Sequence, residues 1–140
     1  MSRHIPTEEL LEQLGCTFTL RADGDYDAVG DINLNDKGLE QLPDLSRVHL
    51  RGAFSCTANK LTSLQGAPKT VSEEFFCNLN ALISLAHAPQ HVRKFNCSHN
   101  KLTSLEHGPR SVALDFYCRR NQLTSLEQGP KTVGENYYCA

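Results

Sequence analysis

The sequence predicts a mostly β solenoid, a stack of short repeats that follows a small N-terminal cap. The first observation is the step between five cysteines, 21, 20, 21 and 21 residues: Cys56, Cys77, Cys97, Cys118 and Cys139. The second is that an asparagine, two leucines, a proline and a valine keep the same step. The third is the alternation in each Phe-x-Cys segment, which is typical of a strand buried on one face. Each repeat is therefore expected to bury the apolar face of its neighbour.

The first 28 residues lie outside this register and are expected to form a cap, residues 1–28. The segment "PTEELLEQLG" predicts a helix over about residues 6–15, with Thr7 as N-cap, acidic residues in the first turn and Gly15 as the stop. "CTFTL" alternates as a strand, and "ADGDYD" contains an Asp-Gly turn. We expect these elements to cover the apolar end of the first repeat.

The solenoid is expected over residues 29–140, as about five repeats and a terminal strand. Its register is V-x-x-(x)-F-x-C-x-x-N-x-L-x-x-L-x-x-x-P, and the optional residue accounts for the 20-residue step. The first copy, "INLNDKGLEQLP", is weaker and has Lys37 in the asparagine position. The Phe-x-Cys strands should pair in parallel about 4.8 Å apart, in one sheet on the concave face.

The rest of the repeat supplies turns and the outer wall. The asparagine should turn the chain inward and bond backbone groups that the turn leaves unpaired, and its loss should cost about 1–3 kcal/mol. The predicted ladder consists of Asn59, Asn80, Asn100 and Asn121. Two leucines then enter the core. The following proline and valine should complete an extended convex side, since proline lacks an N–H donor and 20 or 21 residues leave little room for a helix.

The repeat resembles a known family. L-x-x-L-x-L-x-x-N-x-L is the leucine-rich repeat, and "VRKFNCSHNKL" fits it with Val, Phe and Cys in the first three apolar positions. The resemblance covers about residues 29–140. The short unit with C-x-x-N-x-L-T-S-L is also similar to leucine-rich repeats of phage proteins and, more distantly, of bacterial effectors. This implies a binding fold and a phage origin as expectations.

Composition narrows the class of protein. A chain of 140 residues is one ordinary domain, and a net charge of -2 does not favour nucleic acid as a partner. The sequence contains no apolar run long enough to span a membrane, and "MSRHIPTEELLEQLG" lacks the features of a secretory signal. We expect a cytoplasmic protein, in the host cytoplasm if it is phage-encoded, whose six cysteines are reduced.

Candidate chemistry is weak in this sequence. The cysteine column is expected to be buried core, with a metal or redox role as the alternative, and disulfides between parallel neighbours are not expected. His87 and His107 share one repeat position but lack a third ligand, and "DGDYD" lacks the glycine and glutamate of a calcium loop. No hydrolase or phosphate-binding motif is present. The sequence therefore predicts no enzyme, no metal and no cofactor.

A partner surface can be located from the register. Residues between the inward positions must face outward on the concave sheet, and three of them are aromatic. The predicted partner-binding residues are Phe76, Leu79, Lys94, His99, Tyr117, Arg119, Arg120 and Tyr138. The alternative is that the aromatic rings only stack on one another. Charge on this face changes from acidic at Asp31, Asp36 and Glu74 to basic near the C-terminus, which would orient a partner.

Two functions remain open from sequence. The preferred one is a non-enzymatic module that binds a larger protein, which the phage resemblance extends to an inhibitor of a host protein such as a defence component. The alternative is a self-assembling protein that dimerises through an open strand edge. That predicted edge consists of Glu135, Asn136, Tyr137, Tyr138 and Cys139.

Overall fold

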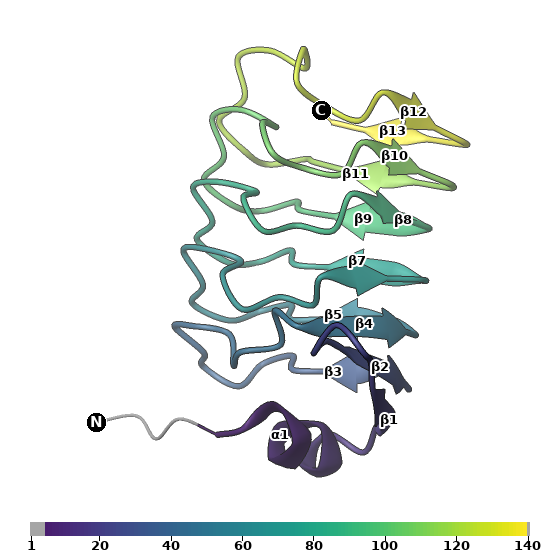
Figure 1. Ribbon diagram of the computed structural model, residues 1–140. Helices are drawn as coiled ribbons and strands as arrows, with labels where there is room; N and C mark the ends of the chain where they lie inside the picture. The colour runs from purple at the N-terminus through teal and green to yellow at the C-terminus, as the bar shows by residue number, and fades with distance from the viewer. Residues whose placement is uncertain (1–4, 140) are drawn as a thin grey trace.

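The computed structural model describes residues 5–139 as a β-solenoid of about five turns with a spacing of about 21 residues (Figure 1). Its single described helix, α1 (Thr7–Gln13), lies below the first turn, at the opposite end of the stack from the C-terminus. The strands are β1 (Thr17–Leu20), β2 (Tyr26–Val29), β3 (Ile32–Asn33), β4 (Val48–Arg51), β5 (Phe54–Ser55), β6 (Thr70–Val71), β7 (Glu74–Phe76), β8 (His91–Val92), β9 (Lys94–Asn96), β10 (Ser111–Val112), β11 (Phe116–Tyr117), β12 (Thr132–Val133) and β13 (Tyr137–Tyr138). Residues 1–4 and Ala140, included in the predicted cap and solenoid, lie outside the described part.

The predicted parallel sheet of Phe-x-Cys segments is present. It has six strands in the order β13-β11-β9-β7-β5-β3, and equivalent positions of successive turns are paired directly. Phe75, for example, is paired with Phe54 on one side and with Phe95 on the other. We refer to the outward side of this sheet as the first face.

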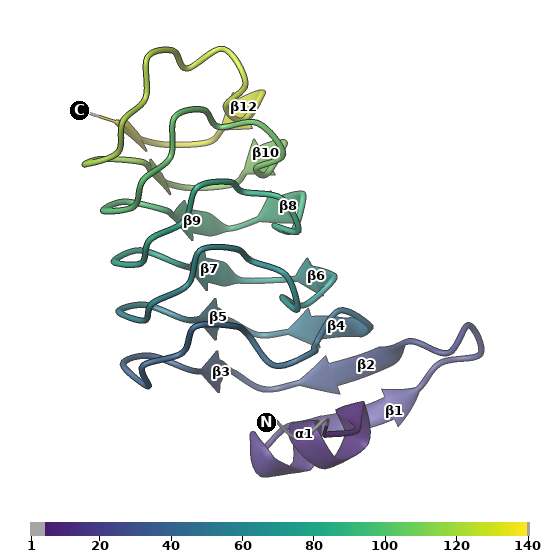
Figure 2. The same ribbon diagram turned by 90° about the vertical axis from the view of Figure 1, so that its left-hand side faces the viewer.

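A second run of parallel strands, which the sequence analysis did not predict, lies beside the first (Figure 2). It consists of β2, β4 and β6, followed by β8, β10 and β12. The expectation of a single parallel sheet with the valines in an outer wall was therefore wrong. Valine favours strands, and both flanks of the valine segment find partners: Lys69 N–H donates to Val48 O (2.8 Å) and Ala113 N–H to Val92 O (3.0 Å). We refer to the outward side of this run as the second face.

A corner joins the two strands of each turn and absorbs the change in repeat length. Two residues, Ser72 and Glu73, separate β6 from β7, whereas Arg93 alone separates β8 from β9. The ladder continues across the shorter corner, because Arg93 N–H donates to Glu73 O (2.9 Å) and Leu114 N–H donates to Arg93 O (2.7 Å). The 20-residue repeat therefore stays in register in the six-stranded sheet, whereas the second run divides here into two sheets, because β6 and β8 are not paired.

The N-terminal segment follows its prediction in outline. Gly15, at φ +77°, ends the helix, and Cys16 N–H donates to Leu11 O (3.0 Å). The predicted N-cap was wrong: Pro6 occupies that position without a side-chain cap, and Thr7 is the first helical residue. Strands β1 and β2 form an antiparallel hairpin, and β2 pairs in parallel with β4, so the hairpin is continuous with the second run.

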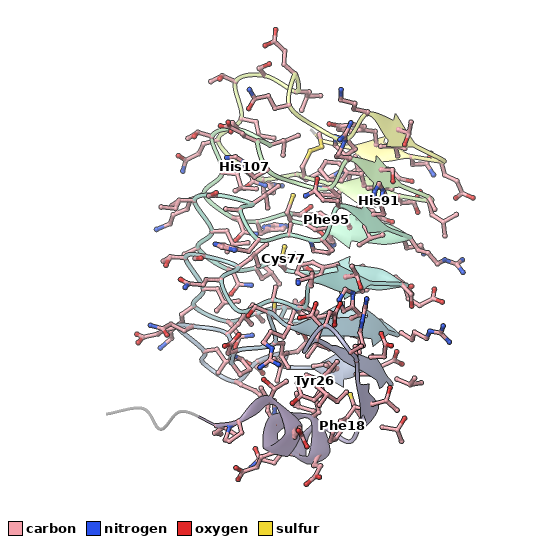
Figure 3. All side chains as sticks on the ribbon, in the orientation of Figure 1. Phe18, Tyr26, Cys77, His91, Phe95 and His107 are labelled. Carbon is pink, nitrogen blue, oxygen red and sulfur yellow. A yellow bond between two sulfur atoms is a disulfide. The ribbon has the colours of Figure 1, made fainter. Side chains whose placement is uncertain are left out.

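The core is a column of stacked rings and thiols. Neighbouring phenylalanine rings have centroids 5.1, 5.3 and 5.8 Å apart, for Phe54, Phe75, Phe95 and Phe116 in turn, and all four are completely buried. Figure 3 shows Cys77 and Phe95 inside the stack. The paired leucines of the turns, such as Leu82 and Leu85, are completely buried on the other side of the core. Among residues 5–139 no helix is long and apolar enough to cross a bilayer.

The asparagines of successive turns bond to the turn below. Asn100 donates from Nδ2 to the carbonyls of its own Cys97 (3.0 Å) and of Cys77 (3.1 Å), and its Oδ1 accepts from Leu82 N–H (2.9 Å). Asn80 and Asn121 repeat this arrangement. Asn59 makes the same kind of hydrogen bonds with the first repeat: its Nδ2 donates to Leu34 O, and its Oδ1 accepts from the N–H groups of Lys37 and Leu39.

Candidate functional site

An aromatic pair dominates the C-terminal half of the first face. The rings of Tyr117 and Tyr138 are stacked, with centroids 4.9 Å apart and an interplanar angle of 14°, because β11 and β13 place them at paired positions. The Arg119 guanidinium lies 4.9 Å from the centroid of the Tyr138 ring, within cation–π distance. Phe76 is two strands away, beside Asn96. The alternative of mutual stacking therefore describes the two tyrosines, and Phe76 stands apart from them.

A shielded carboxylate holds this aromatic pair in place. Asp115, 9% exposed, accepts from the Tyr117 hydroxyl at Oδ2 (3.2 Å) and from the backbone and side-chain nitrogens of Asn136 at Oδ1 (both 3.1 Å). Partial burial, followed by the nearby Asp115 charge, raises the pKa of Tyr117. Asp115 thus ties β11 to the segment before β13 and fixes the Tyr117 ring before any partner arrives.

A row of exposed side chains borders the face where the strands end. Leu79, His99 and Arg120 occupy equivalent turn positions, and each has a φ of 57–58°, in the left-handed region. Their backbones are fixed by the next turn, as in Leu79 N–H to Ser98 O (3.0 Å) and His99 N–H to Arg119 O (2.8 Å). All three are exposed. Their side chains therefore project from a rigid backbone.

Other predicted positions on this face are less accessible. Lys94 is half-buried and paired in register with Glu74. Ser98, which directly follows the Cys97 position, is 7% exposed, and its Oγ accepts from Arg119 N–H (3.1 Å). The asparagine and threonine neighbours nearer the N-terminus bond to one another, for example Thr57 Oγ1 to Asn78 Oδ1 (3.0 Å). The exposed side chains of Leu79, His99 and Arg120 border this face nearer the strand ends.

The cysteine column is core, with one departure from expectation. Cys56, Cys77 and Cys97 are completely buried, and burial raises the pKa of Cys56 to about 12 and that of Cys77 well above its usual value. Cys118, however, forms a disulfide with Cys139. The expectation of no disulfide between parallel neighbours was wrong here, because the Cα atoms of the pair are 4.6 Å apart, within the range that a disulfide spans.

The histidine and acidic candidates lie apart from the first face. His87 and His107 are exposed, at equivalent turn positions with φ of 75° and 68°. Figure 3 shows His107 on the loop side of the stack. No cluster of three or more His, Cys, Asp or Glu side chains suited to a metal ion occurs within the described range. In "DGDYD", the Asp25 carboxylate is occupied by His49 and Lys69.

Those contacts belong to a polar cluster on the second face that the sequence analysis missed. His49 Nε2 lies 3.0 Å from Asp25 Oδ2, and His49 Nδ1 lies 3.1 Å from Thr70 Oγ1. His49 and Thr70 are 21 residues apart, so the repeat step, extended to the valine segment, predicts that they are paired. Asp25 precedes the first repeat, so the register gave no signal for it.

Comparisons of the chain with protein-family models, with curated proteins and with solved structures found no match. The function must therefore be argued from the two faces themselves.

Proposed function

We propose that this protein is a non-enzymatic binding module of the leucine-rich repeat type, which docks a larger protein on its first face. The observation that carries the proposal is the preorganised group of Tyr117, Tyr138 and Arg119, in which two half-buried, stacked aromatic rings lie beside an exposed guanidinium. Tyrosine and arginine are the residue types that contribute most to protein interfaces. Because Asp115 already holds Tyr117, little side-chain entropy is lost on binding.

The surrounding residues suggest how a partner would be oriented. Arg119, Arg120 and His99 make this end basic, whereas Asp31 and Asp36 lie at the other end. An elongated partner with an acidic end and a basic end would bind in one direction. Phe76, Leu79 and Lys94 lie between these ends and would provide apolar contact and register.

The biological setting follows from resemblance alone. The C-x-x-N-x-L-T-S-L unit is similar to repeats of phage proteins, which supports a phage-encoded factor that acts in the host cytoplasm. Such a factor would bind and inhibit a host protein, for instance a component of a defence system.

Affinity capture from a bacterial lysate with mass spectrometry tests the proposal. The wild-type protein is compared with Tyr117→Ala/Arg119→Ala and with a matched control on the loop side, Ile83→Ala/Lys101→Ala. We expect proteins captured by the wild type and by the control to be lost with the first double variant, whose fold is checked by circular dichroism. Identical capture by all three would show that the first face is not the binding surface.

A second candidate is dimerisation through β13. Within the described residues β13 pairs only with β11, and Tyr137 (37%) and Leu126 (48%) of the last turn are exposed. The predicted edge, Glu135 to Cys139, would pair with a second copy. Light scattering decides: a dimeric mass that the Tyr117/Arg119 variant retains supports this candidate, and a monomeric mass at tens of micromolar rejects it.

A further inference from the structure

A hydrogen-bonded chain of three side chains crosses the second face. Asp25 lies just before β2, His49 is on β4 and Thr70 is on β6. Both imidazole nitrogens are engaged, Nε2 with Asp25 Oδ2 (3.0 Å) and Nδ1 with Thr70 Oγ1 (3.1 Å). Asp25 also accepts from Lys69 Nζ (2.8 Å). The chain joins segments 24 and 21 residues apart, so it exists only in the folded solenoid.

The carboxylate fixes the direction of these hydrogen bonds. An ionised Asp25 can only accept, so the neutral imidazole of His49 carries its proton on Nε2. Nδ1 is then the acceptor, and the hydroxyl of Thr70 must donate to it. The hydrogen bonds to Lys69 and then to His49 lower the pKa of Asp25 to about 2, which keeps the carboxylate ionised at neutral pH.

Accessibility increases along the chain toward the hydroxyl. The side chains of Asp25 and His49 are 14% and 20% exposed, whereas Thr70 is an exposed residue. A shielded acid, a partly shielded base and an open hydroxyl are the arrangement that activates a nucleophilic oxygen. Next to Thr70, an open hollow of about 520 Å³ has Ser72, His91 and Arg93 in its lining. Arg93 Nε lies 3.4 Å from Glu73 Oε2, and the rest of its half-exposed guanidinium offers a contact to a small anionic reagent.

We propose that Thr70 is an activated acyl-acceptor hydroxyl, with His49 as its general base and Asp25 as the positioning residue. The acyl donor is an activated carboxylic acid derivative with an anionic leaving group, such as an acyl phosphate, which is a mixed anhydride. Thr70 Oγ1 attacks the carbonyl carbon while His49 Nδ1 takes the hydroxyl proton. The bond from the acyl carbon to the phosphate oxygen then breaks, phosphate leaves with the electron pair, and the proton passes from His49 to solvent. The products are a threonine ester and inorganic phosphate.

The same face contains an internal control for this proposal. His91 Nδ1 lies 2.6 Å from Ser111 Oγ at the equivalent position two turns further on, and among residues 5–139 that imidazole has no carboxylate partner like Asp25. Ser111 therefore has a base but no positioning acid. Thr62 and Thr103, exposed on the loop side, have neither.

Acetylation by acetyl phosphate, mapped by peptide mass spectrometry on the full chain, tests the proposal. We expect Thr70 to be acetylated about 10²-fold faster than Thr62 or Thr103, and faster than Ser111. Hydroxylamine should remove the adduct, because it cleaves the ester and leaves an amide on Lys69 intact. An adduct on Lys69 alone, or equal rates at Thr70 and Thr62, would overturn the proposal.

Two variants separate activation from folding. His49→Gln should lower the rate at Thr70 about 10²-fold, while the matched control His107→Gln, on the loop side, should leave it unchanged. In Asp25→Asn the side-chain amide can donate to Nε2, which moves the imidazole proton to Nδ1. The ¹⁵N spectrum of His49 should report this change of tautomer together with the loss of acetylation. A wild-type spectrum with the proton on Nδ1 would refute the assigned direction, even if a variant failed to fold.

Discussion

Asn100→Ala should reveal how strongly one side chain holds two turns together. Asn100 is 8% exposed. Removal of its side chain leaves the carbonyls of Cys77 and Cys97 and the N–H of Leu82 without their hydrogen bonds to this amide. Each buried group left unpaired costs about 1–3 kcal/mol, but the space left by the amide admits water that restores part of the bonding. We therefore expect the free energy of unfolding to fall by about 2–4 kcal/mol.

Urea denaturation followed by circular dichroism measures this loss. Asn33→Ala is the matched control, since Asn33 is exposed and its Oδ1 accepts a hydrogen bond from the local N–H of Asn35 (2.9 Å). This variant should change the free energy of unfolding by about 0.5 kcal/mol or less. A broader transition for Asn100→Ala would indicate that the turns above and below have become separate folding units. A loss no larger than that of the control would refute the inference that the ladder joins the turns.

Three further predictions follow from the contacts. The pKa of Asp25 is lowered from 3.8 to about 2, so its contribution to the free energy of unfolding is present above about pH 4 and is lost as the pH falls toward 2. The midpoint of urea denaturation should therefore decrease over this pH range in the wild type and change less in Asp25→Asn. In denaturant a thiol reagent should modify four cysteines before reduction and six after it, and six before reduction would contradict the bond between Cys118 and Cys139. Gly52→Ala should lower the free energy of unfolding by more than about 1 kcal/mol, because φ is +153° and the new Cβ would meet the carbonyl of Gly30. Gly38→Ala, at φ +64° with open space around the new Cβ, should lower it by less in the same urea measurement.

The repeat made the stack and its core predictable. Inward and outward positions of the Phe-x-Cys strands follow from period-two alternation, and a fixed step places equivalent residues beside one another. The stacked phenylalanines and the bonds of Asn100 require nothing beyond that register. The solenoid and its spacing of about 21 residues are therefore confirmed.

The features that sequence reasoning missed depend on contacts between residues of different type. A two-residue strand such as Thr70–Val71 has no periodicity of its own and is stabilised by its neighbours, so the second run of strands could not be recognised locally. The shielding of Asp115 depends on Tyr117 and Asn136 together. Asp25 comes from a segment outside the repeat, and only the folded hairpin brings it to His49.

The corner between the two strands of each turn allows turns of different length to keep their strands paired with those of the neighbouring turn. The chain has one residue fewer between Val92 and Phe95 than between Val112 and Phe116, yet Val92 pairs with Val112 and Phe95 with Phe116. A difference of one residue at this point therefore leaves both of these pairings intact, although the second run divides between β6 and β8 on the other side of the same turn. A residue or short tag added beside Arg93 would therefore be accommodated outside the hydrogen-bonded strands, and the corners offer a series of insertion points about 4.8 Å apart along the protein.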